Sequence, residues 1–111
     1  MAKGDAPGEF EQIVLLAVLR LGEEAYGMRV RREIHLRTGR DVTIGAVYTT
    51  LDRLEAKGMV ASSLGEATEE RGGRAKKFFR LTGEAVDALN RARAEMNNML
   101  EGLPFPLGGE R

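Results

Sequence analysis

Near the middle of the chain, residues 43–58 read TIGAVYTTLDRLEAKG. The apolar side chains in this stretch recur at intervals of three and four, which is the spacing of one helix face: Ile44, Val47, Tyr48, Leu51 and Leu54. The opposite face carries small or polar side chains: Gly45, Ala46, Thr49, Thr50 and Arg53. Because Thr43 suits an N-cap and Gly58 suits a helix end, we predict a helix over 43–57 whose outer face can approach another molecule closely.

Two further helices are predicted before this one. Residues 9–21 place apolar side chains on one face, and Leu15, Leu16 and Leu19 make most of the other side apolar as well. A helix of this kind in so small a domain is expected to contact something beyond its own fold. Residues 25–37 form the second predicted helix, with Tyr26, Val30 and Ile34 facing inward and arginines facing outward.

Beyond Gly58, the pattern changes to short strands and a final helix. Residues 59–64 and 76–81 are expected to form a β-hairpin, because the segment between them contains the Gly72-Gly73 turn signal. Thr82 is a predicted cap for the last helix. In that helix, apolar residues alternate steps of four and three, the heptad spacing of a helix–helix seam: Ala85, Leu89, Ala92, Met96, Met99 and Leu103.

Charge is distributed unevenly along the 111 residues. Lys plus Arg and Asp plus Glu both number 17, so the formal net charge is zero. Residues 25–40 nevertheless hold five arginines against one glutamate, and residues 71–80 hold five basic side chains and no acidic one. These two basic segments interrupt an otherwise acidic chain, which favours an anionic partner.

Composition excludes several kinds of chemistry. The chain has no cysteine and one histidine, His35, so we expect neither disulfides nor a transition-metal site, and no cofactor. No nucleophile sits beside a base and no phosphate-binding loop is present, so an enzyme is not expected. The longest apolar run, residues 13–19, is far shorter than the roughly 20 residues of a membrane span, and acidic residues before it disfavour a signal peptide. We therefore expect a cytoplasmic chain without a membrane partner.

The order of three helices and then a two-stranded hairpin is that of a winged helix-turn-helix domain. The DNA major groove, about 12 Å wide, admits a helix with small residues on its front edge, while neighbouring elements contact phosphates on either side. The expected fold class is accordingly mainly α with a small β-hairpin, followed by one C-terminal helix.

The residues themselves add a family resemblance. The stretches EFEQIVLLAVL (9–19), AYG (25–27), IGAVYTTLDRLE (44–55) and RGGRAKKFFRLT (71–82) closely resemble the PadR family of transcriptional regulators. The final helix resembles the shorter branch of that family, in which one C-terminal helix serves for dimerisation. The resemblance implies a homodimeric repressor that binds a pseudo-palindromic operator in double-stranded DNA and is often released by a small molecule. Because the chain has no tryptophan, any effector pocket here must be lined by Met, Leu or Phe.

These considerations divide the chain into four expected segments: a flexible arm (1–8), a winged helix-turn-helix domain (9–82), a dimerisation helix (83–103) and a flexible tail (104–111). The DNA contacts are expected from the recognition helix (43–57), the wing (65–77) and the second helix: Arg29, Arg32, Thr43, Gly45, Ala46, Tyr48, Thr49, Arg53, Arg71, Arg74, Lys76 and Lys77. The expected dimer contacts are Phe10, Val14, Ala85, Leu89, Ala92, Met96, Met99 and Leu103.

Alternatives remain open at this stage. A winged-helix adaptor that binds an acidic protein partner would show the same order of elements and the same basic segments. Tyr48 can be a core aromatic, a phosphate contact, or both at once. Arg53 can pair with Asp52 or Glu55 on the surface, or it can reach a base edge or a phosphate.

Overall fold

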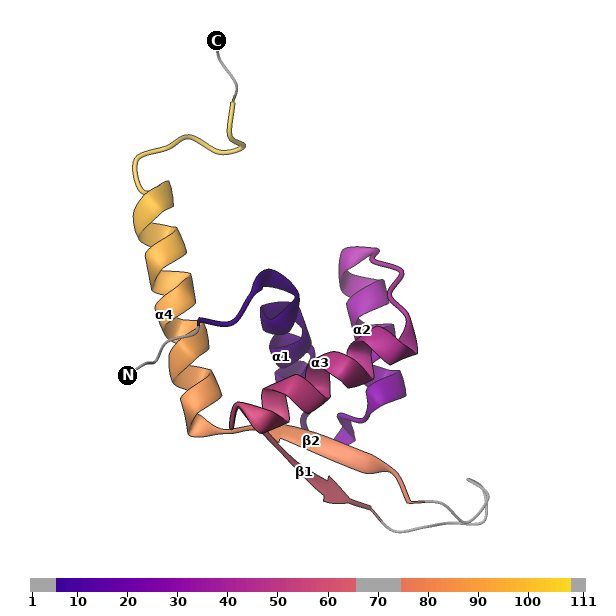
Figure 1. Cartoon of the computed structure of the whole chain (residues 1–111). Helices are drawn as coiled ribbons and strands as arrows, with labels where there is room; N and C mark the ends of the chain where they lie inside the picture. Colours follow the sequence, from indigo (N-terminus) through magenta and orange to yellow (C-terminus); the bar gives the residue numbers. More distant parts are fainter. Residues whose placement is uncertain (1–5, 66–74, 109–111) are drawn as a thin grey trace.

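The computed structural model describes residues 6–65 and 75–108. Figure 1 shows the order of elements, which is the one predicted. They are α1 (Glu9–Leu21), a short 3-10 turn η2 (Gly22–Glu24), α2 (Gly27–Thr38), α3 (Ile44–Ala56), β1 (Val60–Leu64), β2 (Lys77–Leu81) and α4 (Gly83–Leu100). The predicted fold class, mainly α with one small hairpin, is confirmed.

The predicted helix ends agree closely with the observed ones. The Thr43 hydroxyl accepts a hydrogen bond from the Ala46 amide at 3.0 Å, and the Thr82 hydroxyl accepts one from the Ala85 amide at 3.3 Å. Gly39 ends α2 in the left-handed conformation, with φ of 77°, which glycine adopts without a Cβ penalty. The caps predicted for α3 and α4 are therefore present.

Two boundaries differ from the prediction. α2 begins at Gly27 instead of residue 25, because Tyr26 is extended and bridges to Phe78 of β2, and the Phe79 amide donates to the Ala25 carbonyl at 2.8 Å. α4 ends at Leu100, three residues before the predicted end, and the chain then turns through Gly102 with φ of 84°. Leu103 is consequently not part of the helix.

The core lies where α1, α2 and α3 pack together over the hairpin (Figure 1). Its largest fully buried side chains come from all three helices: Val14, Leu15, Val18, Val30, Ile34, Val47, Leu51 and Leu54. Thr50, which was expected on the outer face of α3, is only 4% exposed. That expectation was wrong because position 50 lies one turn from both Val47 and Leu54 and so shares their buried face.

The two strands pair antiparallel, with Val60 opposite Leu81 and Leu64 opposite Lys77. An isolated bridge between Tyr26 and Phe78 adds a third, very short segment on the other edge of β2. The rings of these two residues also meet edge to face, with centroids 5.5 Å apart. The hairpin is thereby attached to the segment that leads into α2, a connection that the sequence did not predict.

α4 differs from the other helices because only its first turns pack on the body. Ala85 and Ala88 are buried, whereas the farther half of the helix projects away from α1–α3 (Figure 1). The molecule is accordingly long, with principal extents of 59 × 35 × 20 Å. Within the described ranges, no helix combines the length and the apolar character needed to cross a membrane.

Candidate nucleic-acid interface

Gly45, Ala46, Tyr48 and Thr49, which we call the outer ridge of α3, are all exposed. They lie on the first two turns of the helix, next to the Thr43 cap. Three of them have small side chains, so the backbone of α3 can come close to a partner surface there. The predicted exposure of Gly45, Ala46 and Thr49 is confirmed.

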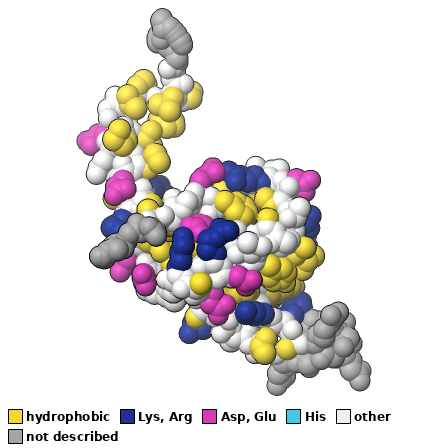
Figure 2. Space-filling view, in the orientation of Figure 1, with side chains coloured by type: hydrophobic (Ala, Val, Ile, Leu, Met, Phe, Trp, Pro, Cys, Tyr) yellow, Lys and Arg dark blue, Asp and Glu magenta, His cyan; other side chains and the backbone are white. Residues whose placement is uncertain are grey.

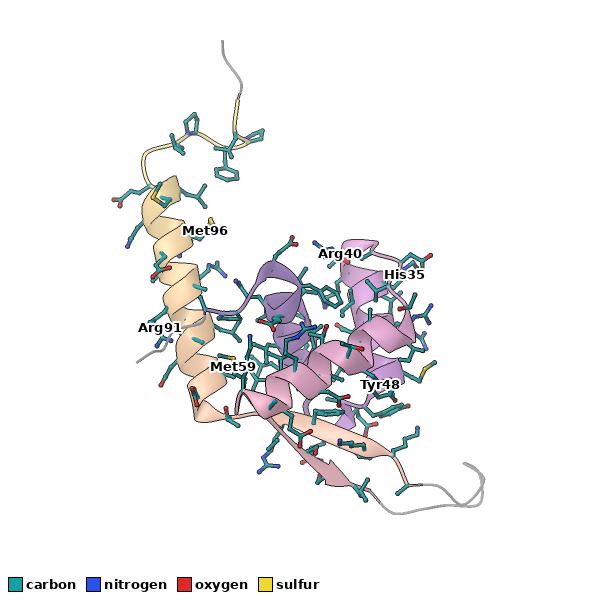
Figure 3. The ribbon with its side chains drawn as sticks, viewed as in Figure 1. His35, Arg40, Tyr48, Met59, Arg91 and Met96 are labelled. Atoms are coloured by element: carbon teal, nitrogen blue, oxygen red, sulfur yellow. The ribbon has the colours of Figure 1, made fainter. Side chains whose placement is uncertain are left out.

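Tyr48 was expected in the buried stripe, but 41% of it is exposed. Its ring lies directly on Gly27: a Cβ at that glycine would come within 2.4 Å of the Tyr48 Cζ atom. The absence of a side chain at Gly27 therefore lets the tyrosine rest on the first turn of α2. Figure 3 shows Tyr48 at this junction, near the hairpin. Its aromatic body is partly covered while the residue stays accessible at the edge of the outer ridge.

The two basic segments of the sequence meet at Tyr26. The Lys76 ammonium, just before β2, lies 3.7 Å from the centroid of the Tyr26 ring, a cation–π contact. Hydrogen bonding with Lys76, and then with Arg29 of α2, outweighs burial and lowers the pKa of the Tyr26 phenol below its ordinary value. Two cations thus lie beside the Gly27–Tyr48 contact: Lys76, just before β2, and Arg29, in the first turn of α2.

The outward side of α2 forms a shallow basic hollow of about 420 Å³. The charged side chains that line it come from α2 and from the loop before α3: Arg29, Arg31, Arg32, Arg40 and Asp41; His35 lines it as well. The Arg31 Nε donates to the Val42 carbonyl at 2.7 Å, which fixes the backbone just before the Thr43 cap. Arg32 is exposed and makes no ion pair with any residue in the described ranges, so its charge is available to a ligand.

Several predicted DNA-binding cations are paired within the chain. Lys77 lies 3.5 Å from the Glu55 carboxylate, which also accepts a 2.7 Å hydrogen bond from Ser62. The Ser62 bond, followed by Lys77, lowers the pKa of Glu55. Arg29 lies 3.9 Å from Glu24, a loose contact between exposed groups. Pairs of this kind are weak, and a phosphate can replace the carboxylate.

Arg53 pairs with Glu11 of α1 at 3.6 Å, and not with Asp52 or Glu55, the surface partners that the sequence left open. Glu11 is only 7% exposed, and Lys57 holds both of its oxygens at 3.1 Å. Burial on its own would raise the pKa of Glu11, but the Gly8 amide, Lys57 and Arg53 together hold it below its ordinary value. The sequence did not reveal this carboxylate because its two cationic partners, Arg53 and Lys57, are more than 40 residues away.

Comparison with known proteins agrees with this geometry. The profile described as "Transcriptional regulator PadR-like family" matches residues 15–91. The chain belongs to this family. Membership makes it a DNA-binding transcription regulator and not an enzyme. A comparison with curated protein sequences finds no match.

Solved structures of other regulators and of a winged-helix protein have the same fold. A transcriptional regulator from Clostridium thermocellum is 22% identical, with a TM-score of 0.67 over 82% of this chain and 85% of that one. A PadR family regulator from Eggerthella lenta is 25% identical, with a TM-score of 0.63 over 82% and 77%. F93 from STIV, a winged-helix DNA-binding protein, is 20% identical, with a TM-score of 0.64 over 82% and 90%. The winged-helix architecture is thus shared.

The expected contacts of this PadR-like chain with a second copy are only partly at its surface. Val14 and Ala85 were expected at the dimer interface, but both are fully buried within the single chain and leave no side-chain surface for a partner. Phe10 is half-buried, with the Arg40 guanidinium 6.0 Å from its ring centroid. Two expected wing residues, Arg71 and Arg74, lie outside the described residues.

Other residues of the expected seam are partly or mostly exposed. Leu89 and Ala92 are half-buried, Met96 is 59% exposed and Met99 is 76% exposed. Figure 2 shows hydrophobic side chains gathered on the projecting half of α4, and Figure 3 marks Met96 there. Leu16 and Leu19 of α1 are exposed as well, although neither was among the expected interface residues. The sequence contained a signal for this exposed apolar surface, because residues 9–21 are apolar on more than one side of the helix.

Proposed function

We propose that this PadR-like regulator is a homodimeric repressor that binds a pseudo-palindromic operator in the cytoplasm. The recognition helix (43–57) and the wing (65–77) are the DNA-contacting parts. One observation carries this proposal: the accessible outer ridge of α3 is bordered by Arg29 and Lys76, which come from two distant basic segments and meet at Tyr26.

In this proposal the first half of α3 enters the major groove. Gly45, Ala46 and Thr49 allow close approach to base edges, and the Thr43 cap leaves the positive end of the helix near a phosphate. The DNA backbone on one side of the groove is contacted by Tyr48, Arg29, Arg32 and Lys76. Arg53, Lys77, Arg71 and Arg74 supply further phosphate contacts from α3 and the wing.

The second copy is proposed to cover the seam of α4. Large apolar side chains on a projecting helix are costly in water, and pairing two such seams buries them. Leu89, Ala92, Met96 and Met99 form this surface, with Leu103 beyond the end of the helix and Leu16 and Leu19 of α1 as added contacts. A twofold dimer would place two recognition helices about 34 Å apart, one turn of DNA, which matches a pseudo-palindromic operator.

A small-molecule effector is proposed to bind beside the strands of the hairpin. A hollow of about 490 Å³ lies among the end of α1, the hairpin and the start of α4. Its apolar lining comes from Val18, Leu19, Phe78, Leu81 and Val86. This volume is in the range of small-ligand sites, and it contacts the elements that join the DNA-binding part to α4.

The proposal is tested by footprinting on the DNA upstream of the gene for this chain. We expect a protected inverted repeat, and an affinity that falls with salt by a log–log slope of about −0.9 for each phosphate neutralised. Arg29→Ala and Lys76→Ala should each weaken binding, whereas Arg91→Ala on the far side of the molecule from α3 is the matched control. Equal affinity for operator and random duplex would contradict sequence-specific binding.

The same variants distinguish the adaptor alternative. A protein-binding module would keep its DNA affinity unchanged in Arg29→Ala and Lys76→Ala while losing capture of an acidic partner. A repressor loses DNA affinity in both. Transcription from the upstream promoter, measured in vitro with and without the protein, separates repression from activation.

A further inference from the structure

Glu11 is a nearly buried carboxylate that contacts three basic or N–H groups from separate parts of the chain. It accepts a hydrogen bond from the Gly8 amide at 3.1 Å, which closes the first turn of α1. Lys57, just after α3, contacts both carboxylate oxygens at 3.1 Å. Arg53, within α3, lies 3.6 Å away. The proposed contacts with DNA give no role to this carboxylate.

We propose that Glu11 occupies, in the free protein, the place of a DNA phosphate on Arg53, and that Arg53 moves from Glu11 to a phosphate when DNA binds. This inference rests on the proposed DNA contact through α3. Glu11 is therefore an internal competitor that lowers affinity for DNA without touching it.

The two cations on Glu11 are held very differently. Both contacts of Lys57 are within hydrogen-bonding distance, and its side chain is 31% exposed. The Arg53 contact is longer than a hydrogen bond, and half of that side chain is exposed. Lys57 thus binds Glu11 firmly, whereas Arg53 is attracted to it by charge alone.

Because of this difference, the move of Arg53 from Glu11 to a phosphate costs little free energy. Removing the sole partner of a buried charge leaves that charge uncompensated, which is strongly destabilising. When Arg53 departs, however, Lys57 and the Gly8 amide still satisfy the Glu11 oxygens. Arg53 can therefore leave without depriving the carboxylate of its hydrogen bonds.

Arg53 is also well placed to reach DNA. It follows Thr49 by one helical turn, so the two side chains are neighbours on the surface of α3. A guanidinium binds carboxylate and phosphate oxygens with the same planar donors, so a phosphate can take over the contact directly. A lysine in the same place would lack this paired geometry.

The test uses the full-length protein and a duplex carrying the footprinted operator, with affinity measured over a range of salt concentrations. Arg53→Gln should weaken binding and make the salt slope shallower by about 0.9, the loss of one phosphate contact. Glu11→Gln should strengthen binding several-fold without changing the slope, because Arg53 then has no carboxylate contact to break before it binds a phosphate. In the Arg53→Gln background, the gain from Glu11→Gln should disappear, which also excludes a contribution from the released Lys57.

Arg91→Gln on α4 is the matched control for the loss of one arginine, and thermal unfolding checks that each variant is folded. Because Arg53 is half-exposed, Arg53→Gln should fold, and on its own it tests whether Arg53 reaches a phosphate, the step on which the exchange depends. An unchanged affinity and slope in Arg53→Gln would overturn the exchange, as would a Glu11→Gln gain that persists without Arg53. If the wild-type protein itself shows no operator binding, the proposed function fails instead.

Discussion

The body formed by α1–α3 and the hairpin differs sharply from the projecting half of α4. In the body, side chains such as Leu15, Leu51 and Leu54 are fully buried by neighbours from the same chain. In the projecting half, Met96 and Met99 are mostly exposed. Yet both regions follow regular apolar helical spacing. An apolar stripe therefore predicts that a face will be covered, but it does not tell whether the cover comes from the same chain or from another.

The largest expected effect comes from breaking the stripe on α4. Met96→Glu combined with Met99→Glu should give a monomer, because four like charges would meet at the paired seam. Operator affinity should fall at least 100-fold, since two half-sites are then no longer bound together. Light scattering after gel filtration gives the oligomeric state, and fluorescence anisotropy gives the affinity.

Asn90→Glu combined with Asn97→Glu is the control for this experiment. These exposed positions add the same charge on the opposite side of α4. The control protein should remain a dimer with an affinity reduced much less. A wild-type protein that is already monomeric at micromolar concentration would contradict the proposed seam.

A smaller effect is expected inside the body, at the contact between Gly27 and Tyr48. Gly27→Ala places a methyl group where the Tyr48 ring lies, and overpacking of this kind costs about 1–3 kcal/mol of unfolding free energy. Adding Tyr48→Ala should recover much of that loss because it empties the space. Urea unfolding measures both changes.

Gly45→Ala is the matched control, because the nearest atom to a Cβ there is the Thr43 hydroxyl at 3.9 Å. Alanine also favours helix more than glycine, so this variant should be as stable as the wild type or up to about 1 kcal/mol more stable. Equal destabilisation at positions 27 and 45 would show that the Tyr48 contact does not explain Gly27.

The N-caps of α3 and α4 should differ by less. Thr43→Ala removes one cap bond and should cost about 0.5–2 kcal/mol. Thr82→Ala should cost roughly 1 kcal/mol more, because the Thr82 hydroxyl also donates to the Gly58 carbonyl at 2.7 Å. Chemical denaturation of both variants, with Thr49→Ala as an exposed control, measures the difference. If Thr82→Ala lowers the free energy of unfolding no more than Thr43→Ala does, the bond to the Gly58 carbonyl does not stabilise the fold.

The smallest expected effect is on the stability of the folded state at acidic pH. Because the pKa of folded Glu11 lies below its ordinary value of 4.5, its charge stabilises the folded state above pH 4.5. That stability is lost as pH falls from 4.5 through the lower folded-state pKa. Glu11→Gln should therefore flatten the fall in melting temperature below pH 4.5, whereas Glu95→Gln on α4 should leave the profile as in the wild type. An identical acid profile for Glu11→Gln and the wild type would contradict the lowered pKa.

Local features of the fold were predictable from the sequence. The spacing of Val47, Leu51 and Leu54, the Thr43 and Thr82 caps and the Gly39 helix end depend on residues within a few positions of one another. The order of the predicted elements indicated the winged helix-turn-helix architecture, and the family resemblance agreed with it. The position of Thr50 was also predictable, because its spacing from Val47 and Leu54 already placed it on the buried face.

The candidate site was less predictable because it depends on contacts between distant residues. Nothing near Glu11 in the sequence indicates that Lys57 and Arg53 surround it. The exposure of Tyr48 depends on Gly27, 21 residues earlier, and the pairing of Ala25 with Phe79 joins segments more than 50 residues apart. A count of basic residues likewise overstates the free positive charge, because it does not include the carboxylates that Lys77 and Arg53 contact.

The bridge at Tyr26 has a consequence for how copies of this chain can associate. A strand with an unpaired edge is a template on which another molecule can extend the sheet. Here the outer edge of β2 is already taken at Phe78 and Phe79, and the remaining edge belongs to β1, a five-residue strand with two serines. Growth by strand addition is thus blocked on one side and poorly supported on the other. In the proposed homodimer, association of two copies is therefore left to helical surfaces such as the seam of α4.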